Sequence, residues 1–251
     1  MEIRSRAGGA GTLGSRRYLV ALALALTAGL FLAACASDNG VAKKAPTEIL
    51  QASAAALRSV TSYQVQGKVP TGTGSTLGSF NFRVGGANLG EGNFALGTLK
   101  FQLTEIKKTV YIKSATLWEA LDGGALQDLL ANHWVSIPAT SPYATALTDG
   151  VTSLTSAKST AASMTKGAQA AKREGRITVD QQGAVKVVVS KKTTVFVATT
   201  GRPYPVRVTG TKGSYLDLSN FDTTFTIKAP KQSVSLLDVI AGVEAGVGGT
   251  G

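Results

Sequence analysis

The 251-residue sequence contains one cysteine and one histidine, and these two shortages exclude most catalytic and metal chemistry. A hydrolase triad or a histidine metal cluster would have to use His133, which stands beside Trp134 at the start of an expected strand and fits a structural or surface role. A disulfide would need a second thiol. The aspartates are scattered through turn and helix-edge contexts, so their spacing indicates no acid/base pair. We therefore expect no enzyme activity, no metal site and no cofactor.

Two ligand-binding signatures are missing as well. The glycine-rich stretch TGTGST, residues 71–76, is not followed by Gly-Lys-Ser/Thr and has strands on both sides, so it indicates a turn rather than a phosphate loop. No arginine-rich, aromatic-interleaved stretch is present, so we expect no nucleic-acid partner. The net charge is nevertheless +11. Such a surface attracts anionic lipid headgroups when it lies near a membrane, although dispersed lysines also fit ordinary solvation.

The single cysteine, Cys35, stands at the end of an apolar run. Residues 1–17 carry four arginines against one acid, and residues 18–34 carry no charge, which is the layout of an export signal. The run is at the short limit for a transmembrane helix, so its length alone leaves a simple membrane anchor open. The last four residues, Leu32-Ala33-Ala34-Cys35, match the bacterial lipobox at every position. This resemblance implies a diacylglyceryl group on Cys35, signal cleavage before it and stable membrane anchoring; the alternative is a spare cysteine at a helix end.

The expected location is therefore the extracytoplasmic face of the cell membrane. Ser15-Arg16-Arg17 also resembles the twin-arginine export motif, but it equally fits the basic end of an ordinary signal, which we favour. The expected organisation is a lipoprotein signal peptide over 1–34, a flexible tether over 35–45, a lipid-binding domain over 46–243 and a disordered tail over 244–251.

Apolar periodicity indicates a fold in which strands predominate. Residues 47–60 have helical spacing, and the chain then switches to alternation. Tight glycine turns between the short strands favour an antiparallel meander. The expected strands lie at 63–69, 80–84, 92–96, 99–106, 109–113, 134–138, 175–181, 184–190, 193–199, 204–210, 214–219 and 221–230. Residues 115–134 indicate one or two short helices, 141–170 a loop and a weakly amphipathic helix, and 233–243 a final helix.

An antiparallel sheet of this size tends to curl, and its helices can bury their apolar sides only against one of its faces. Several segments resemble, in their order, the LppX/LprG lipoprotein family of actinobacteria, which has the LolA/LolB-like fold. They are the lipobox, SVTSYQVQGKV, VYIKSATLWEAL, HWVSIP, GRPYPVRV and LDLSNFDTTFTIKAP. The resemblance implies an α+β fold with a curved antiparallel half-barrel and helices across its concave face. It also implies an apolar cavity for the acyl chains of lipids or lipoglycans, a role in carrying or presenting them in the envelope, and a membrane transporter as a further candidate partner.

Strand alternation selects the residues that face the helices. The candidates for the lipid cavity are Tyr63, Val65, Phe80, Phe82, Val84, Phe101, Val187, Val206, Val208, Leu216 and Leu218. Small side chains in ASAAAL and AKSTAAS suggest a cavity, because a filled core would use leucines. The rival hypothesis is a lipid-tethered interaction or sensor domain with a closed core and no lipid ligand.

Overall fold

The computed structural model describes residues 37–71, 76–122 and 125–247. The signal segment 1–34 and Cys35 lie outside this range. Residues Asp38–Gly251 form one compact unit. Its last helix extends to Val247, so the first part of the tail expected over 244–251 is helical.

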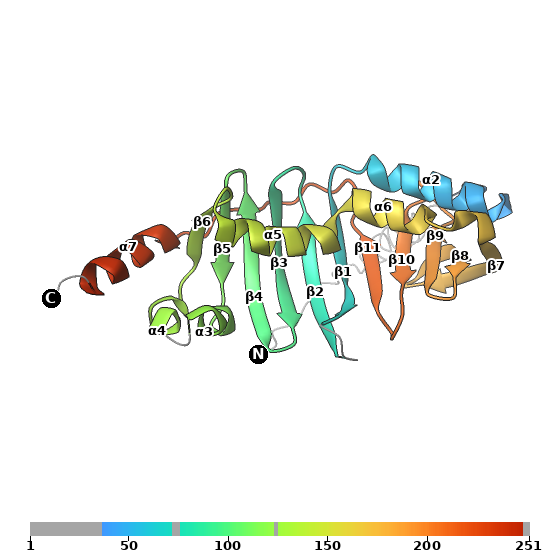
Figure 1. Ribbon diagram of the computed structural model, residues 1–251. Helices are drawn as coiled ribbons and strands as arrows, with labels where there is room; N and C mark the ends of the chain where they lie inside the picture. Colours follow the sequence, from blue (N-terminus) through green and yellow to red (C-terminus); the bar gives the residue numbers. More distant parts are fainter. Residues whose placement is uncertain (1–36, 72–75, 123–124, 248–251) are drawn as a thin grey trace, which may run out of the picture. The chain divides into compact units, whose positions relative to one another are not determined.

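The unit is built on one open sheet in which all neighbouring strands are antiparallel except β12 and β6 (Figure 1). The strands are β1 (Tyr63–Pro70), β2 (Leu77–Val84), β3 (Leu89–Leu96), β4 (Leu99–Ile106), β5 (Thr109–Lys113), β6 (Val135–Pro138), β7 (Lys172–Val179), β8 (Gln182–Ser190), β9 (Thr193–Ala198), β10 (Pro205–Thr209), β11 (Tyr215–Ser219) and β12 (Val234–Ser235). Their order across the sheet is β12-β6-β5-β4-β3-β2-β1-β11-β10-β9-β8-β7. Two meanders therefore meet at the β1–β11 pair, and the predicted α+β class with a curved antiparallel sheet is confirmed.

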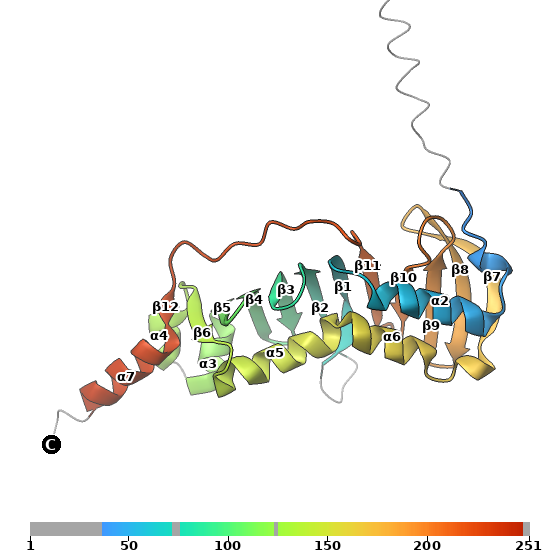
Figure 2. The ribbon, with the colours of Figure 1, turned by 90° about the horizontal axis from the view of Figure 1, so that it is seen from above.

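Helices α2 (Pro46–Arg58), α5 (Pro142–Thr155) and α6 (Ala157–Thr165) lie on one face of this sheet, which we call the inner face (Figure 2). The other helices are α3 (Thr116–Asp122), α4 (Ala125–Leu130) and α7 (Leu236–Val247), which projects beyond the β12 edge of the sheet, with 3-10 turns at η1 (Val41–Lys43) and η2 (Ala168–Ala170). Within the described ranges, none of these helices has both the length and the hydropathy to cross a bilayer.

Helices α5 and α6 cross the inner face because of the topology. The chain leaves β6 near one edge of the sheet and re-enters at β7, the opposite edge. Ten strand spacings of about 4.8 Å separate these two strands along the sheet. The 14 residues of α5 and the 9 of α6 cover about 35 Å of this path at 1.5 Å per residue. The sequence predicted a loop and one weak helix over 141–170, whereas the structure has two helices.

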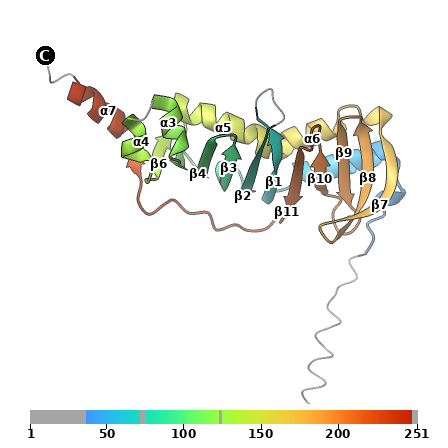
Figure 3. The same cartoon turned by 90° about the horizontal axis from the view of Figure 1, so that it is seen from below.

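A long segment between β11 and β12, residues 220–233, runs along the opposite face, which we call the outer face (Figures 2 and 3). The prediction of a strand over 221–230 is wrong, because this segment has no regular secondary structure. The alternation of apolar and polar residues in this segment has a cause other than strand pairing. The ring of Phe225 lies 5.9 Å from the guanidinium of Arg83, and Ile227 approaches Gly85, so the extended segment packs side chains on the sheet without pairing with a strand.

Residues that the sequence assigned to a flexible tether are held against the sheet. Asp38 forms a bridge with Thr200, and the backbone N–H of Asn39 donates to the carbonyl of Thr199 over 2.8 Å. The guanidinium of Arg173 donates to the carbonyl of Ala42 over 2.6 Å. The expectation of a flexible tether over 35–45 therefore does not hold for its part from Asp38 onward.

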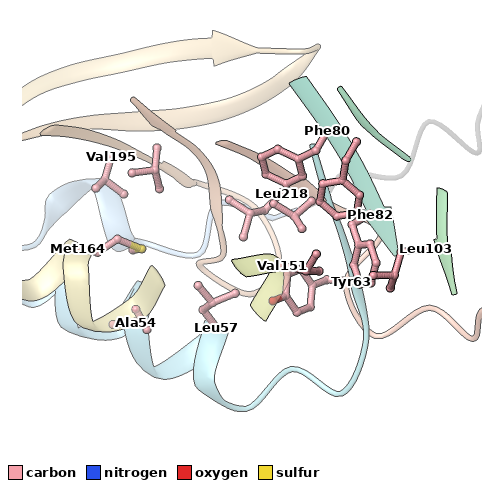
Figure 4. Close-up of a cluster of buried hydrophobic side chains, with 14 of the residues drawn as sticks. Ala54, Leu57, Tyr63, Phe80, Phe82, Leu103, Val151, Met164, Val195 and Leu218 are labelled. Carbon is pink, nitrogen blue, oxygen red and sulfur yellow. The ribbon is translucent and has the colours of Figure 1, made fainter. Parts of the chain in front are cut away.

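The alanine-rich helices pack closely against each other. Helices α2 and α6 are neighbours, and Ala54, Ala161 and Met164 are fully buried in one core with the valines of β8 and β9. Figure 4 shows Ala54 and Met164 on the side of Val195. Small side chains allow two helix backbones to approach while both cover the sheet. In this half of the unit, ASAAAL and AKSTAAS therefore serve close helix packing rather than opening a cavity.

Candidate functional site

A cluster of phenylalanines covers the inner face of β2–β4. The rings of Phe80 and Phe94 stack with centroids 5.9 Å apart, and those of Phe94 and Phe101 stack at 4.8 Å. Phe82 meets Phe94 at 5.7 Å with its ring tilted by 48°. These residues come from three adjacent strands, and strand alternation turns them all to the same face. They form an apolar floor beneath the helices.

Two glycines on β3 make room for one of these rings. A Cβ atom at Gly90 would lie 2.5 Å from Phe82 Cε1, and one at Gly92 would lie 2.6 Å from Phe82 Cδ2. The Phe82 ring therefore lies flat along β3, which only glycine permits at both positions. The flat ring leaves space above it, where α5 ends and α6 begins.

That space is a pocket of about 540 Å³ between the inner face and the α5–α6 junction. Its apolar walls come from β1–β3, the residues before β1 and the start of α6, namely Val60, Tyr63, Phe82, Val84, Leu89 and Ala157. Thr61, Asn88 and Thr152 are exposed residues of its lining and mark the mouth. A volume of this size is typical of small-molecule sites, which are mostly apolar with a few polar groups at one end.

Tyr63 connects the floor of the pocket to its roof. The residue is 3% exposed, and its hydroxyl donates a hydrogen bond to the backbone carbonyl of Thr155, the last residue of α5. Burial raises the pKa of the Tyr63 phenol, so the hydroxyl keeps its proton at physiological pH. In Figure 4, Tyr63 lies beside Val151 of α5 and near Phe82 and Leu103. The end of α5 is thus fixed to the sheet at the pocket.

One carboxylate, that of Glu105, lines this otherwise uncharged pocket. Glu105 follows Phe101 and Leu103 at two-residue spacing on β4, so it shares the inner face with them. Its side chain has no hydrogen bond and no salt bridge with any of the described residues. Burial raises its pKa, because the charged form is poorly solvated there.

A larger groove of about 690 Å³ runs over β2–β5, beside Ala115 and Ala131. Phe80, Phe94 and Phe101 line this groove, and so do the polar residues Asn81, Asn93, Gln102 and Lys113. An acyl chain gains nothing from carboxamides and an ammonium group. We therefore take the smaller inner pocket as the candidate lipid site.

The structure brings some of the sequence candidates together and separates others. Tyr63, Phe82 and Val84 line the inner pocket. Most of the others belong to the main buried core, namely Val65, Phe80, Phe101, Val187, Val208 and Leu218, with Leu216 packed against it. Val206 lies instead in a second small cluster with Val179, Ala184 and Ala198, because the register between β9 and β10 shifts at this residue. Contact between any of these residues and a lipid stays a prediction.

Sequence reasoning missed several residues of the pocket. Glu105 had a usable signal, because it follows the candidate residue Phe101 at an even spacing on β4. Thr152 and Thr155 had none, because the sequence around them is too poor in large apolar residues to reveal α5.

No protein-family model matches this chain, and no curated protein sequence matches it. Solved structures do. LprF from Mycobacterium bovis is 19% identical, with 74% of this chain and 96% of that chain covered and a TM-score of 0.47. The Mycobacterium tuberculosis lipoprotein LppX is 17% identical, with 73% and 98% covered and a TM-score of 0.41. Both neighbours belong to the LppX/LprG family that the sequence motifs resemble.

Proposed function

We propose that this protein is an exported, membrane-anchored lipoprotein that binds lipids or lipoglycans and carries or presents them in the cell envelope. The observation that carries the proposal is the pocket of about 540 Å³ between the inner face and the α5–α6 junction. Its apolar walls suit acyl chains, and its polar mouth suits a headgroup. Catalysis plays no part in this function.

The proposal includes the arrangement of the chain. Residues 1–34 act as the signal peptide, Cys35 carries the diacylglyceryl anchor, and residues 46–243 form the lipid-binding domain. Two or more acyl chains on Cys35 would anchor the protein stably. The protein would then work at the extracytoplasmic face of the cell membrane, where a transporter is a further candidate partner.

A second candidate function, an interaction or sensor domain with a closed core, is favoured by the other half of the inner face. There the inward-facing valines of β8 and β9 are buried, and Val187 and Val195 are completely so. A domain closed in this way would use its surface rather than its interior.

Mass spectrometry of lipids bound to the purified protein separates the two candidates. The suitable protein is the chain from Asp38 onward, because it forms one compact unit with its own core and lacks the acylated cysteine. We expect stoichiometric lipid with acyl chains after purification without detergent. A lipid-free protein that also takes up no lipid from vesicles would support the closed-core alternative.

A further inference from the structure

The inner pocket contains a charge without a counter-charge, and this bears on which lipids it accepts. Glu105 is the one charged residue among those that line the pocket. Its cross-strand neighbours on the inner face are Gly90 on β3 and Val110 on β5, neither of which can compensate a carboxylate. Among the described residues, no lysine or arginine is paired with it.

The groups opposite Glu105 are uncharged and hydroxylic. Thr152, Thr155 and Ser156 face the pocket from the α5–α6 junction, and Thr61 and Asn88 line it from the loops that flank β1 and β3. Two of these hydroxyls already have acceptors, because Thr155 donates to the carbonyl of Val151 over 2.9 Å and Thr61 donates to the carboxylate of Asp222 over 3.1 Å. The remaining hydroxyls and the amide can exchange hydrogen bonds with a polar headgroup, but none of them neutralises a phosphate.

We infer that Glu105 makes the pocket selective for lipids whose polar end offers hydroxyl donors and carries no negative charge, such as glycosylated diacylglycerols. This inference rests on the proposed lipid-binding function and adds the class of headgroup. A hydroxyl that donates to a carboxylate forms a charge-assisted hydrogen bond, which is stronger than a neutral one. A phosphate at the same place meets a like charge in a partly buried site, where solvent screens the repulsion poorly. The raised pKa of Glu105 agrees with a carboxylate that lacks a partner until a ligand arrives.

The test measures headgroup preference by competition. The chain from Asp38 onward is loaded with a pyrene-labelled diacylglycerol, and the probe is displaced by monogalactosyl diacylglycerol or by phosphatidylglycerol with identical acyl chains. We expect the neutral glycolipid to compete about tenfold better than the anionic lipid at low salt. Glu105→Gln keeps the shape of the side chain and removes its charge, so this preference should shrink at least about fivefold, mainly through tighter phosphatidylglycerol binding.

Glu119→Gln is the matched control, because Glu119 is exposed on α3 and its substitution changes the net charge equally. It should leave the preference unchanged. Equal competition by the two lipids, or an unchanged preference in Glu105→Gln, would overturn the inference while leaving lipid binding intact. Failure of the probe to bind at all would overturn the proposed function and the inference with it.

Discussion

The hydroxyl of Tyr63 on β1 donates its hydrogen bond to the carbonyl oxygen of Thr155, where α5 ends. Both residues are buried, at 3% and 7% exposed. This one contact links the sheet to the helix that roofs the pocket. Tyr63→Phe keeps the ring and removes the donor, which leaves a buried carbonyl without this partner.

We expect Tyr63→Phe to lower the free energy of unfolding by about 1–3 kcal/mol, measured by urea denaturation of the chain from Asp38 onward. Tyr111→Phe is the control, because Tyr111 is half-buried on β5 and its hydroxyl has no hydrogen-bond partner among the described residues. Equal effects of the two substitutions would mean that the contact with Thr155 contributes nothing to stability.

A tryptophan in place of valine tests where space exists. Val84 lines the pocket and is partly exposed, whereas Val65 is 1% exposed in the packed core. Val84→Trp should displace lipid with little change in melting temperature, because its side chain enters the pocket. Val65→Trp should cost about 1–3 kcal/mol or more through overpacking. Bound lipid and melting temperature are measured together on both variants, and a stable, lipid-loaded Val84→Trp protein would contradict the assignment of the pocket.

Gly92→Ala tests the close approach of Phe82 to β3. The new Cβ would lie 2.2 Å from the carbonyl oxygen of Asn81 and 2.6 Å from the Phe82 ring. We expect a loss of about 1–3 kcal/mol, read from thermal unfolding. Gly150→Ala should act in the opposite direction, gaining about 0.5–1 kcal/mol, because Gly150 lies inside α5 and a Cβ added there would meet no heavy atom within 4 Å. A neutral Gly92→Ala would show that the ring can move away without cost.

Glu105 should make stability depend on pH. Its folded-state pKa lies above its ordinary value of 4.5, so the folded protein binds a proton more tightly than the unfolded chain. The stabilisation from this proton is complete below about pH 4 and is lost as the pH rises through the folded-state pKa. Glu105→Gln should therefore unfold at higher urea than the parent at pH 7, and this advantage should vanish near pH 4. If Glu105→Gln instead gained more stability over the parent at pH 4 than at pH 7, the folded-state pKa of Glu105 would not be raised.

Cys35→Ala tests the anchor. Without the thiol no diacylglyceryl group can be attached, so the precursor should stay uncleaved or be cut elsewhere, and labelling with radioactive fatty acid should be lost. Cell fractionation and mass spectrometry of the N-terminus provide the measurement. A variant that is still cut before residue 35 and still acylated would disprove the lipobox interpretation.

The sequence predicted the sheet better than the pocket, for a physical reason. Alternation in β1 and β2 is strong, so Tyr63 and Phe82 could be assigned to the inner face directly. Helix α5 packs on the core through Val151, Leu147 and Leu154, but small and hydroxylic residues separate them, so the residues around Thr155 gave little signal. Val206 followed the alternation rule, but a shift in register at this residue turned it to another cluster, and such shifts depend on pairing between distant strands.

The bridge between Asp38 and Thr200 limits the distance between the folded unit and a membrane in which Cys35 is anchored. Three residue steps separate Cys35 from Asp38, and a fully extended chain covers at most about 3.3–3.6 Å per residue, or about 10 Å in total. A tether of that length keeps the folded unit close to the bilayer, so the anchored unit cannot cross the envelope. With Cys35 as the proposed anchor, a lipid would be handed over at the surface of the bilayer, and the acceptor would have to come to it.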